Sequence, residues 1–86
     1  MRIFLHKNSV KKYQKLSENE RKRFKERRDM FCIDPFQPPL NNHPLKGKYK
    51  GCRSINITGD VRAVYRYVKQ ETVEFITIGT HGRLYE

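Results

Sequence analysis

The chain has 86 residues, with 19 Lys and Arg against 9 Asp and Glu, which gives a formal net charge of +10 at pH 7. This length leaves room for one small domain, residues 1–86, and excludes a second core or a separate cofactor-binding domain. The basic excess indicates a polyanionic partner, such as nucleic acid, an anionic membrane or an acidic protein. The hydrophobic content of 36% is low, but the apolar residues follow regular patterns, so we expect a folded domain with a thin core.

Several classes of protein are excluded by the sequence. No apolar run approaches the roughly 18 residues of a membrane span, and the first apolar stretch is too short for a signal peptide, so we expect a cytoplasmic protein without a membrane partner. Phosphate-binding loops and dinucleotide motifs are absent from the sequence. Cys32 and Cys52 lack metal-site spacing, and we expect two reduced, half-buried thiols, with a zinc site or a disulfide as alternatives. We therefore expect no metal and no cofactor.

The first third of the chain predicts a strand followed by two helices. Residues 2–6 alternate as a short strand does, and Asn8 or Ser9 is expected to cap a first helix. The segment Ser17-Glu18-Asn19-Glu20 fits a capping box, which predicts a second helix from about residue 18 to residue 31. Phe24 and Phe31 should face inward from it, and the two helices should form a hairpin. Residues 1–30 hold 11 basic and 4 acidic side chains, so net +7 of the total charge lies here.

The remainder of the chain predicts an antiparallel sheet. Three prolines between residues 35 and 39 end the helical region, and a linker is expected to continue through His43 and Pro44. The hydrophobic period then becomes two, which predicts strands over residues 53–58, 61–69 and 72–78. The last of these is the most apolar, and we expect it at the centre of the sheet. The fold class is therefore α+β, with an N-terminal strand and a helical hairpin packed on a small antiparallel sheet.

Residue types suited to proton transfer and phosphate binding gather in the second half. They lie in four short segments: His43-Pro44-Leu45-Lys46-Gly47, Gly51-Cys52-Arg53, Asp60-Val61-Arg62, and Gly79 to Tyr85. Each segment alone has an ordinary structural explanation, such as a loop histidine or a solvated strand arginine. His6 receives no functional role, and Tyr65 and Tyr67 are interpreted as core or partner-contact residues.

Taken in this order, the segments resemble the RelE/ParE toxin superfamily, and most closely its YafQ branch of messenger-RNA interferases. The specific parts are H-P-L-x-G and the closing G-T-H-x-x-L-aromatic, and the resemblance covers residues 43–85. It implies a RelE-like fold in the order strand, helix, helix, strands. Carried over by position, it implies a catalytic set of His43, Asp60, Arg62, His81 and Tyr85.

Two positions depart from the YafQ pattern. Asn56 stands where that branch has a histidine, and Val61 stands where it has a tryptophan. An asparagine cannot exchange a proton near neutral pH, so one acid or base of the family is missing. Arg62 is closer to the pattern of the RelE branch and could supply phosphate binding.

The residue types themselves fit RNA cleavage without a metal. A base deprotonates a 2′-OH, which attacks the adjacent phosphate, while an acid protonates the departing 5′-oxygen and cations stabilise the added charge. Histidine, with an unperturbed pKa of about 6.5, suits either proton role, and arginine can bind two phosphate oxygens. We expect His43 and His81 to be the proton-transfer pair, in either order. The cations expected to bind RNA or phosphate are Lys46, Lys48, Arg53 and Arg83.

The leading hypothesis is therefore a ribosome-dependent endoribonuclease toxin that cuts messenger RNA. The resemblance implies two partners: the ribosome with its messenger RNA, and an antitoxin protein that covers the basic groove. The basic surface of the second helix is expected to dock on ribosomal RNA through Arg21, Lys22, Lys25 and Arg28. Two alternatives remain: a ParE-like toxin that binds DNA gyrase, and a basic RNA-binding domain that is inactive because of Asn56.

Overall fold

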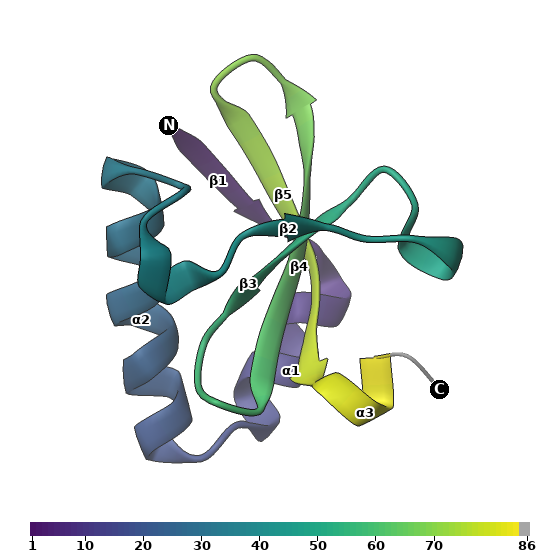
Figure 1. Cartoon of the computed structure of the whole chain (residues 1–86). Coiled ribbons are helices and arrows are strands. Elements are labelled where there is room, and N and C mark those ends of the chain that lie inside the picture. The colour runs from purple at the N-terminus through teal and green to yellow at the C-terminus, as the bar shows by residue number, and fades with distance from the viewer. Residues whose placement is uncertain (85–86) are drawn as a thin grey trace.

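The computed structural model of the chain describes residues 1–84, which form a five-stranded sheet and three α-helices (Figure 1). The N-terminal part comprises strand β1 (Arg2–Leu5), helix α1 (Lys7–Lys15) and helix α2 (Glu18–Ile33). Two short 3₁₀ turns, η1 (Pro38–Leu40) and η2 (Gly47–Tyr49), flank strand β2 (His43–Pro44). Strands β3 (Arg53–Asn56), β4 (Val61–Lys69) and β5 (Thr72–Thr80) follow, and a short helix α3 (His81–Leu84) comes last. The predicted α+β class and element order are confirmed.

The sheet has the order β1-β5-β4-β3-β2, in which β1 runs parallel to β5 and the other pairs are antiparallel. The expectation that the last strand is central is wrong, because β1 adds outside β5 and β2 adds outside β3, which leaves β4 in the middle. The expected linker is also partly wrong, since His43 pairs with Ser54 and Pro44 pairs with Arg53 at the sheet edge. Proline is tolerated there because an edge strand needs fewer backbone donors.

The helices start at caps of different kinds. The predicted capping box is confirmed: the Glu20 amide donates to Ser17 Oγ (3.1 Å) and the Ser17 amide donates to the Glu20 carboxylate (2.8 Å). The predicted cap of the first helix is wrong, because His6 Nδ1 accepts from the Asn8 amide (3.1 Å). Ser9 is instead buried, and its hydroxyl donates to the Phe75 carbonyl of β5 (2.7 Å). Ser9 thus joins α1 to the sheet.

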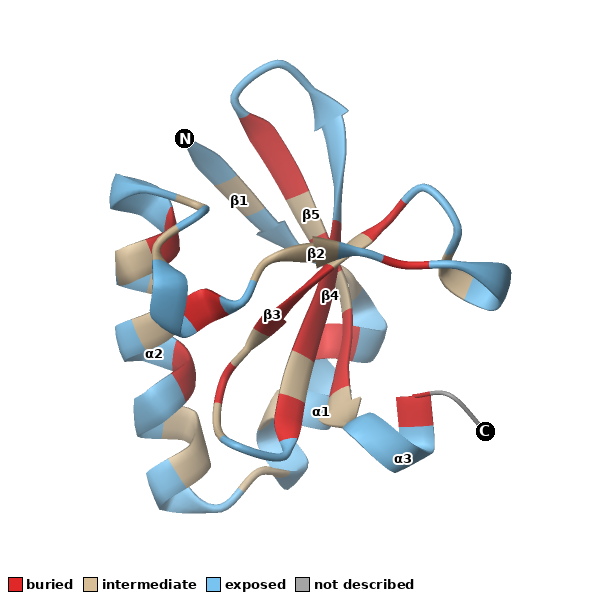
Figure 2. Cartoon of the chain, in the orientation of Figure 1, coloured by how far each residue is buried: buried red, intermediate tan, exposed pale blue. Residues whose placement is uncertain are grey.

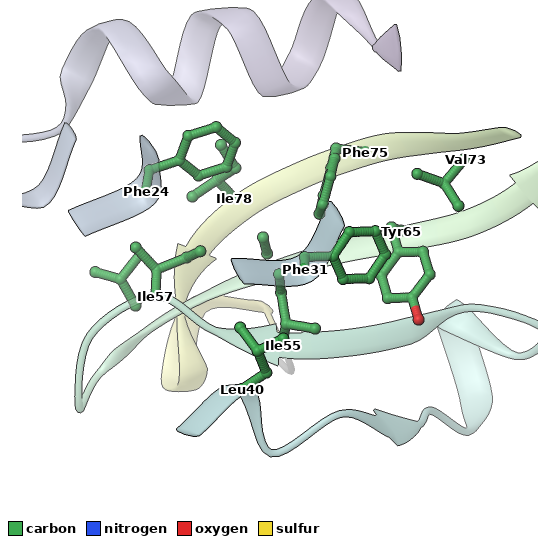
Figure 3. Packing of buried hydrophobic residues seen from close by; sticks show 11 residues of the cluster. Phe24, Phe31, Leu40, Ile55, Ile57, Tyr65, Val73, Phe75 and Ile78 are labelled. Atoms are coloured by element: carbon green, nitrogen blue, oxygen red, sulfur yellow. The ribbon is translucent and has the colours of Figure 1, made fainter. Parts of the chain in front are cut away.

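One face of the sheet, the helix face, carries the main core beneath α1 and α2 (Figures 2 and 3). Phe24 and Phe31 face inward as predicted. Their rings pack edge-on, with centroid distances of 5.9 Å from Phe24 to Phe75 and 4.8 Å from Phe31 to Tyr65. Tyr13 of α1 adds a ring 5.5 Å from Phe24, which packs the two helices against each other. Edge-to-face aromatic pairs of this kind add stability beyond the area they bury.

The opposite side of the sheet, the second face, is covered more thinly. A smaller cluster of Leu45, Cys52, Val64 and Leu84 lies there, with Tyr49 and Ile76 packed against it. Leu84 belongs to α3, which folds back toward this side at the end of β5 (Figure 1). The chain therefore has a heavily covered helix face and a second face that is partly open. Among residues 1–84, no helix is long and apolar enough to cross a membrane.

Candidate active site

His43 lies over the second face of the sheet. It pairs with Ser54, which pairs with Val64, and Val64 belongs to the cluster of the second face. Cross-strand partners project to the same face, so the half-buried imidazole lies over this side. Its Nδ1 is 2.8 Å from the Asn41 carbonyl oxygen. Because a carbonyl only accepts, Nδ1 carries the proton, and in the neutral ring Nε2 is left as the proton acceptor.

A second group of predicted residues meets at the turn between β3 and β4, which we call the turn corner (Asp60, Arg62 and His81). Arg62 Nη1 donates to the carbonyls of Gly59 (2.9 Å) and Thr58 (3.1 Å). The His81 amide donates to the Asp60 carbonyl (3.0 Å), so α3 begins against this turn. Since Nη1 holds the turn, Nε and Nη2 are the guanidinium nitrogens left to donate to another acceptor.

His43 and the turn corner lie on the same face but apart. Arg62 pairs with Asn56 and with Gly79. This cross-strand row lies two residues along the strands from the row that contains His43 and Ser54. His43 and Arg62 are separated by two inter-strand spacings of about 4.8 Å each and by two residues along the strand at about 3.3 Å each. Their Cα atoms therefore lie about 12 Å apart. The two side chains are engaged with different carbonyls, Arg62 with those of Thr58 and Gly59 and His43 with that of Asn41, so they are not bonded to each other.

Two polar side chains between these groups were not predicted as site residues. Within residues 1–84, Ser54 Oγ and Asn56 Oδ1 are buried and have no hydrogen-bond partner. Buried polar atoms in folded proteins are nearly always paired. The alternation of residues 53–58 already separated both from Ile55 and Ile57, but it carried no signal that this polar face is buried.

A pocket of about 430 Å³, which we call the α1–α3 pocket, lies beside the turn corner. It unites two predicted phosphate-binding residues, Lys48 of η2 and Arg83 of α3, with Lys12 and Lys15 of α1, which were not predicted. The residues that line it are Lys12, Lys15, Leu16, Glu20, Lys48, Tyr49, Val61, Thr77, Ile78, Gly79, Thr80, Arg83 and Leu84.

The predicted docking residues of α2 lie elsewhere. Lys22 and Lys25 are exposed and line a shallow hollow of about 690 Å³ together with Arg21. Arg21 also has a structural contact, because its Nη1 donates to the Leu16 carbonyl (2.7 Å) at the end of α1. Arg28 forms an ion pair with Asp29 (3.3 Å).

The structure does not bring Arg53 together with the other predicted residues. It lies on the helix face, where its Nε donates to Asn42 Oδ1 (2.7 Å) and its guanidinium is 5.3 Å from the centre of the Phe36 ring. The Asn42 amide in turn donates to the Tyr65 hydroxyl (2.8 Å). Lys46 is exposed in the loop after β2. Tyr85 lies outside the described residues.

The cysteines are free, as expected, but only Cys52 is sheltered, and the expectation of a half-buried Cys32 is wrong because that thiol is exposed. Burial raises the pKa of Cys52, and the nearby Arg66 opposes this only in part. A thiol with a raised pKa is a poor nucleophile. In the described part of the chain, no three His, Cys, Asp or Glu side chains are grouped as a metal site would require.

Comparison with solved structures identifies the fold as that of the RelE-like toxins. YafQ from E. coli strain BL21(DE3) matches with a TM-score of 0.82 at 19% identity, over 100% of both chains. The YoeB/ParE toxin from Agrobacterium tumefaciens matches with a TM-score of 0.78 at 25% identity, over 94% of this chain and 99% of that one. The archaeal RelE-RelB complex from Pyrococcus horikoshii OT3 matches with a TM-score of 0.75 at 26% identity, over 95% and 96%.

The family model described as "Bacterial toxin of type II toxin-antitoxin system, YafQ" matches residues 2–86. The chain therefore belongs to the YafQ toxin family and is the toxin of a toxin–antitoxin system, which confirms the resemblance inferred from its motifs. None of the curated proteins compared with the chain matches it.

Proposed function

We propose that residues 1–86 form one toxin domain, an endoribonuclease that cuts messenger RNA on the ribosome by metal-independent transesterification. The observation that carries this proposal is the second face, where His43 and the turn corner flank a strip of buried, unpaired polar atoms. The family to which the chain belongs supports the same reading.

His43 is the general base in this proposal. Its Nδ1 is engaged with the Asn41 carbonyl at 2.8 Å, so Nε2 is the nitrogen that can take the proton of a 2′-OH. A fixed tautomer matters because a base must present a lone pair in a constant direction. The backbone pairing of β2 with β3 holds the residue in place.

His81 is then the general acid, which protonates the departing 5′-oxygen. It is exposed at the first position of α3, and its backbone is tied to Asp60 at 3.0 Å. Arg62 offers Nε and Nη2 to the phosphate while Nη1 holds the turn. Asp60 orients the turn corner through its backbone, and Tyr85 follows α3 as a candidate contact to a base.

Asn56 replaces a proton-transfer group with a fixed amide. Its partner across the strands is Arg62, so it borders the phosphate site. Its Oδ1 is buried and unpaired, so the amide would have to rotate to present a polar atom to the substrate. We propose that it positions the substrate and that two histidines suffice for proton transfer.

Two macromolecular partners follow from this function. The RelE-RelB complex from Pyrococcus horikoshii OT3 pairs a related toxin with a second protein, and the charge of +10 favours an acidic antitoxin segment here. Lys22 and Lys25, exposed on α2, would contact ribosomal RNA. Cutting messenger RNA during translation would take place in the cytoplasm.

A reconstituted translation reaction tests the proposal directly. Primer extension on the messenger should reveal new 5′ ends only when both the toxin and ribosomes are present. The chemistry also requires a 2′,3′-cyclic phosphate on the upstream fragment and cleavage that persists in a chelator of divalent ions that spares the ribosome. Gyrase-trapped DNA breaks with intact messenger would instead support the ParE-like alternative, and RNA binding without cleavage would support an inactive RNA-binding domain.

A further inference from the structure

The α1–α3 pocket concentrates positive charge from three separate elements. Lys12 and Lys15 come from α1, Lys48 from η2 and Arg83 from α3, and all four are exposed at its rim. Glu20 is the acidic residue among those that line it, and its carboxylate already accepts the Ser17 amide at 2.8 Å in the capping box. The rim therefore has a strong net attraction for an anion.

The pocket is also lined by apolar side chains, which we call its floor because they are more buried than the four cations. Leu16, Tyr49 and Leu84 supply it, and Leu84 is 5% exposed and packs closely against Gly79. A Cβ at Gly79 would lie 3.4 Å from Leu84 Cδ2. The Lys48 ammonium is 5.4 Å from the centre of the Tyr49 ring, which holds a cation at the edge of this floor.

An apolar floor inside a cationic rim matches the two ends of a nucleotide. A base can lie against aromatic and aliphatic side chains, while its phosphate meets lysine and arginine. A volume of about 430 Å³ falls in the range of ordinary ligand pockets. Neither a purely cationic surface nor a purely apolar groove would offer both parts.

The pocket is also adjacent to the turn corner. Val61 and Thr80 line the pocket. Val61 directly follows Asp60 in the sequence, and Thr80 directly precedes His81. We propose that the α1–α3 pocket is a subsite for a nucleotide that neighbours the scissile phosphate in the same RNA strand, with Lys12 and Lys15 binding its phosphate. This inference rests on the proposed ribonuclease function and names residues of α1 that the sequence motifs do not include.

The chain contains its own matched control for this proposal. Helix α1 carries Lys7 and Lys11 in addition to Lys12 and Lys15, all four are exposed, and only the latter pair lines the pocket. The double variants Lys12→Gln/Lys15→Gln and Lys7→Gln/Lys11→Gln therefore remove the same charge from the same helix. Thermal melting of both variants verifies that α1 remains folded.

The probe is a fluorescein-labelled hexaribonucleotide with 2′-O-methyl groups, which cannot be cleaved by attack of a 2′-OH. Fluorescence anisotropy between about 50 and 200 mM salt should show a loss of affinity of about 10-fold or more for the pocket pair, and of less than about threefold for the control pair. The slope of log affinity against log salt should also fall by about 1.4 for the pocket pair. Equal losses for the two pairs, or no binding by the unmodified chain, would overturn the subsite.

Glu20→Gln adds a test of opposite sign. Glutamine preserves the capping box but removes the negative charge at the pocket, so affinity for the same probe should rise about two- to threefold. An unchanged or weaker affinity would contradict a phosphate at this rim.

Cleavage by translating ribosomes, measured for both lysine pairs, separates the two proposals. A chain that does not cleave, yet loses probe affinity only with the pocket pair, would overturn the ribonuclease function and leave a nucleotide-binding pocket. A chain that cleaves, with both pairs equally impaired, would keep the function and overturn the subsite.

Discussion

The two faces of the sheet differ in how their buried polar groups are paired, although Arg27 Nη1 of α2, the helix that covers the helix face, is also buried without a partner within residues 1–84. On the helix face, Ser9 is bonded to the Phe75 carbonyl at 2.7 Å, and the Tyr65 hydroxyl accepts from Asn42 at 2.8 Å. On the second face, Ser54 Oγ and Asn56 Oδ1 are buried without a partner within residues 1–84. The helix face also holds the aromatic core, whereas the second face has the smaller cluster.

This difference indicates a division of labour between the faces. Paired polar groups and packed rings stabilise one side, and unpaired polar groups accompany the candidate catalytic residues on the other. Unsatisfied atoms and strain are features that proteins keep at functional sites at a cost in stability. Substitutions on the two faces should therefore change different measured quantities.

The largest expected effect is a loss of RNA cleavage when a histidine of the candidate active site is replaced. His43→Ala and His81→Ala should each lower the rate of ribosome-dependent cleavage by about 100- to 10,000-fold, the usual contribution of a general acid or base. Stability should change little, because His43 is half-buried and His81 is exposed. The third histidine is the control: His6→Asn keeps a residue that caps helices well and should leave the rate unchanged. A rate reduced less than threefold by His81→Ala would remove that residue from proton transfer.

The next largest effect is expected on the helix face, where a substitution should lower stability and leave cleavage nearly unchanged. Phe31 is fully buried and its ring packs on both Tyr65 (4.8 Å) and Phe75 (5.7 Å). Phe31→Ala should lower the free energy of unfolding by about 3–5 kcal/mol, as measured by urea denaturation. Cleavage per folded molecule should remain close to that of the unmodified chain. A strong loss of cleavage by the folded fraction would show that the faces are not separable.

Each face has one fully buried serine, Ser9 on the helix face and Ser54 on the second face. Replacing each by alanine removes the same hydroxyl group from the two faces. Ser9→Ala removes a hydrogen bond and should cost about 1 kcal/mol, since the Phe75 carbonyl keeps its bond from the His6 amide at 2.9 Å. Ser54→Ala removes an unpaired hydroxyl and should be neutral or slightly stabilising. Urea denaturation of both variants gives the difference directly. A cost for Ser54→Ala as large as that for Ser9→Ala would mean that Ser54 has a partner in solution.

The sequence was most informative where a signal is local. The capping box of residues 17–20 set the start of α2, and the inward positions of Phe24 and Phe31 followed from helical spacing. The alternation in residues 53–58 also placed Arg53 with Ile55 and Ile57, which is the helix face in the structure. Its assignment as an RNA-binding residue rested on residue type and not on that pattern.

Features that depend on contacts distant in sequence could not be predicted. The two residues of β2 have no strand pattern of their own and pair only because β3 is present. The residue that caps α1 could not be predicted, because the Ser9 hydroxyl bonds to the Phe75 carbonyl of β5. The Asn8 amide donates instead to His6 Nδ1. The α1–α3 pocket joins residues 12–20 to residues 48–84, and no local motif links them. Position in the sheet likewise follows from topology, so the most apolar strand need not be central.

The smallest expected effect is a change in unfolding free energy at alkaline pH. Two buried groups contribute to it, the Tyr65 phenol on the helix face and the Cys52 thiol on the second face. Burial raises the pKa of the Tyr65 phenol above its ordinary value near 10, and burial likewise raises that of the Cys52 thiol above 9.0. For a group whose pKa is raised on folding, its contribution to stability is complete below the unfolded pKa and disappears as pH rises through the folded pKa. Unfolding free energy should therefore fall as pH rises through about 9 and above.

The two contributions can be separated by substitution. Tyr65→Phe should flatten the fall above about pH 10, and Cys52→Ala should flatten the part that begins near pH 9. Comparing slopes, and not absolute stabilities, removes the loss of the Asn42 bond that Tyr65→Phe also causes. Urea denaturation at closely spaced alkaline pH values makes the comparison. If neither variant changes the slope, the alkaline loss arises from groups outside both buried clusters, and the helix face has no greater sensitivity to base than the second face.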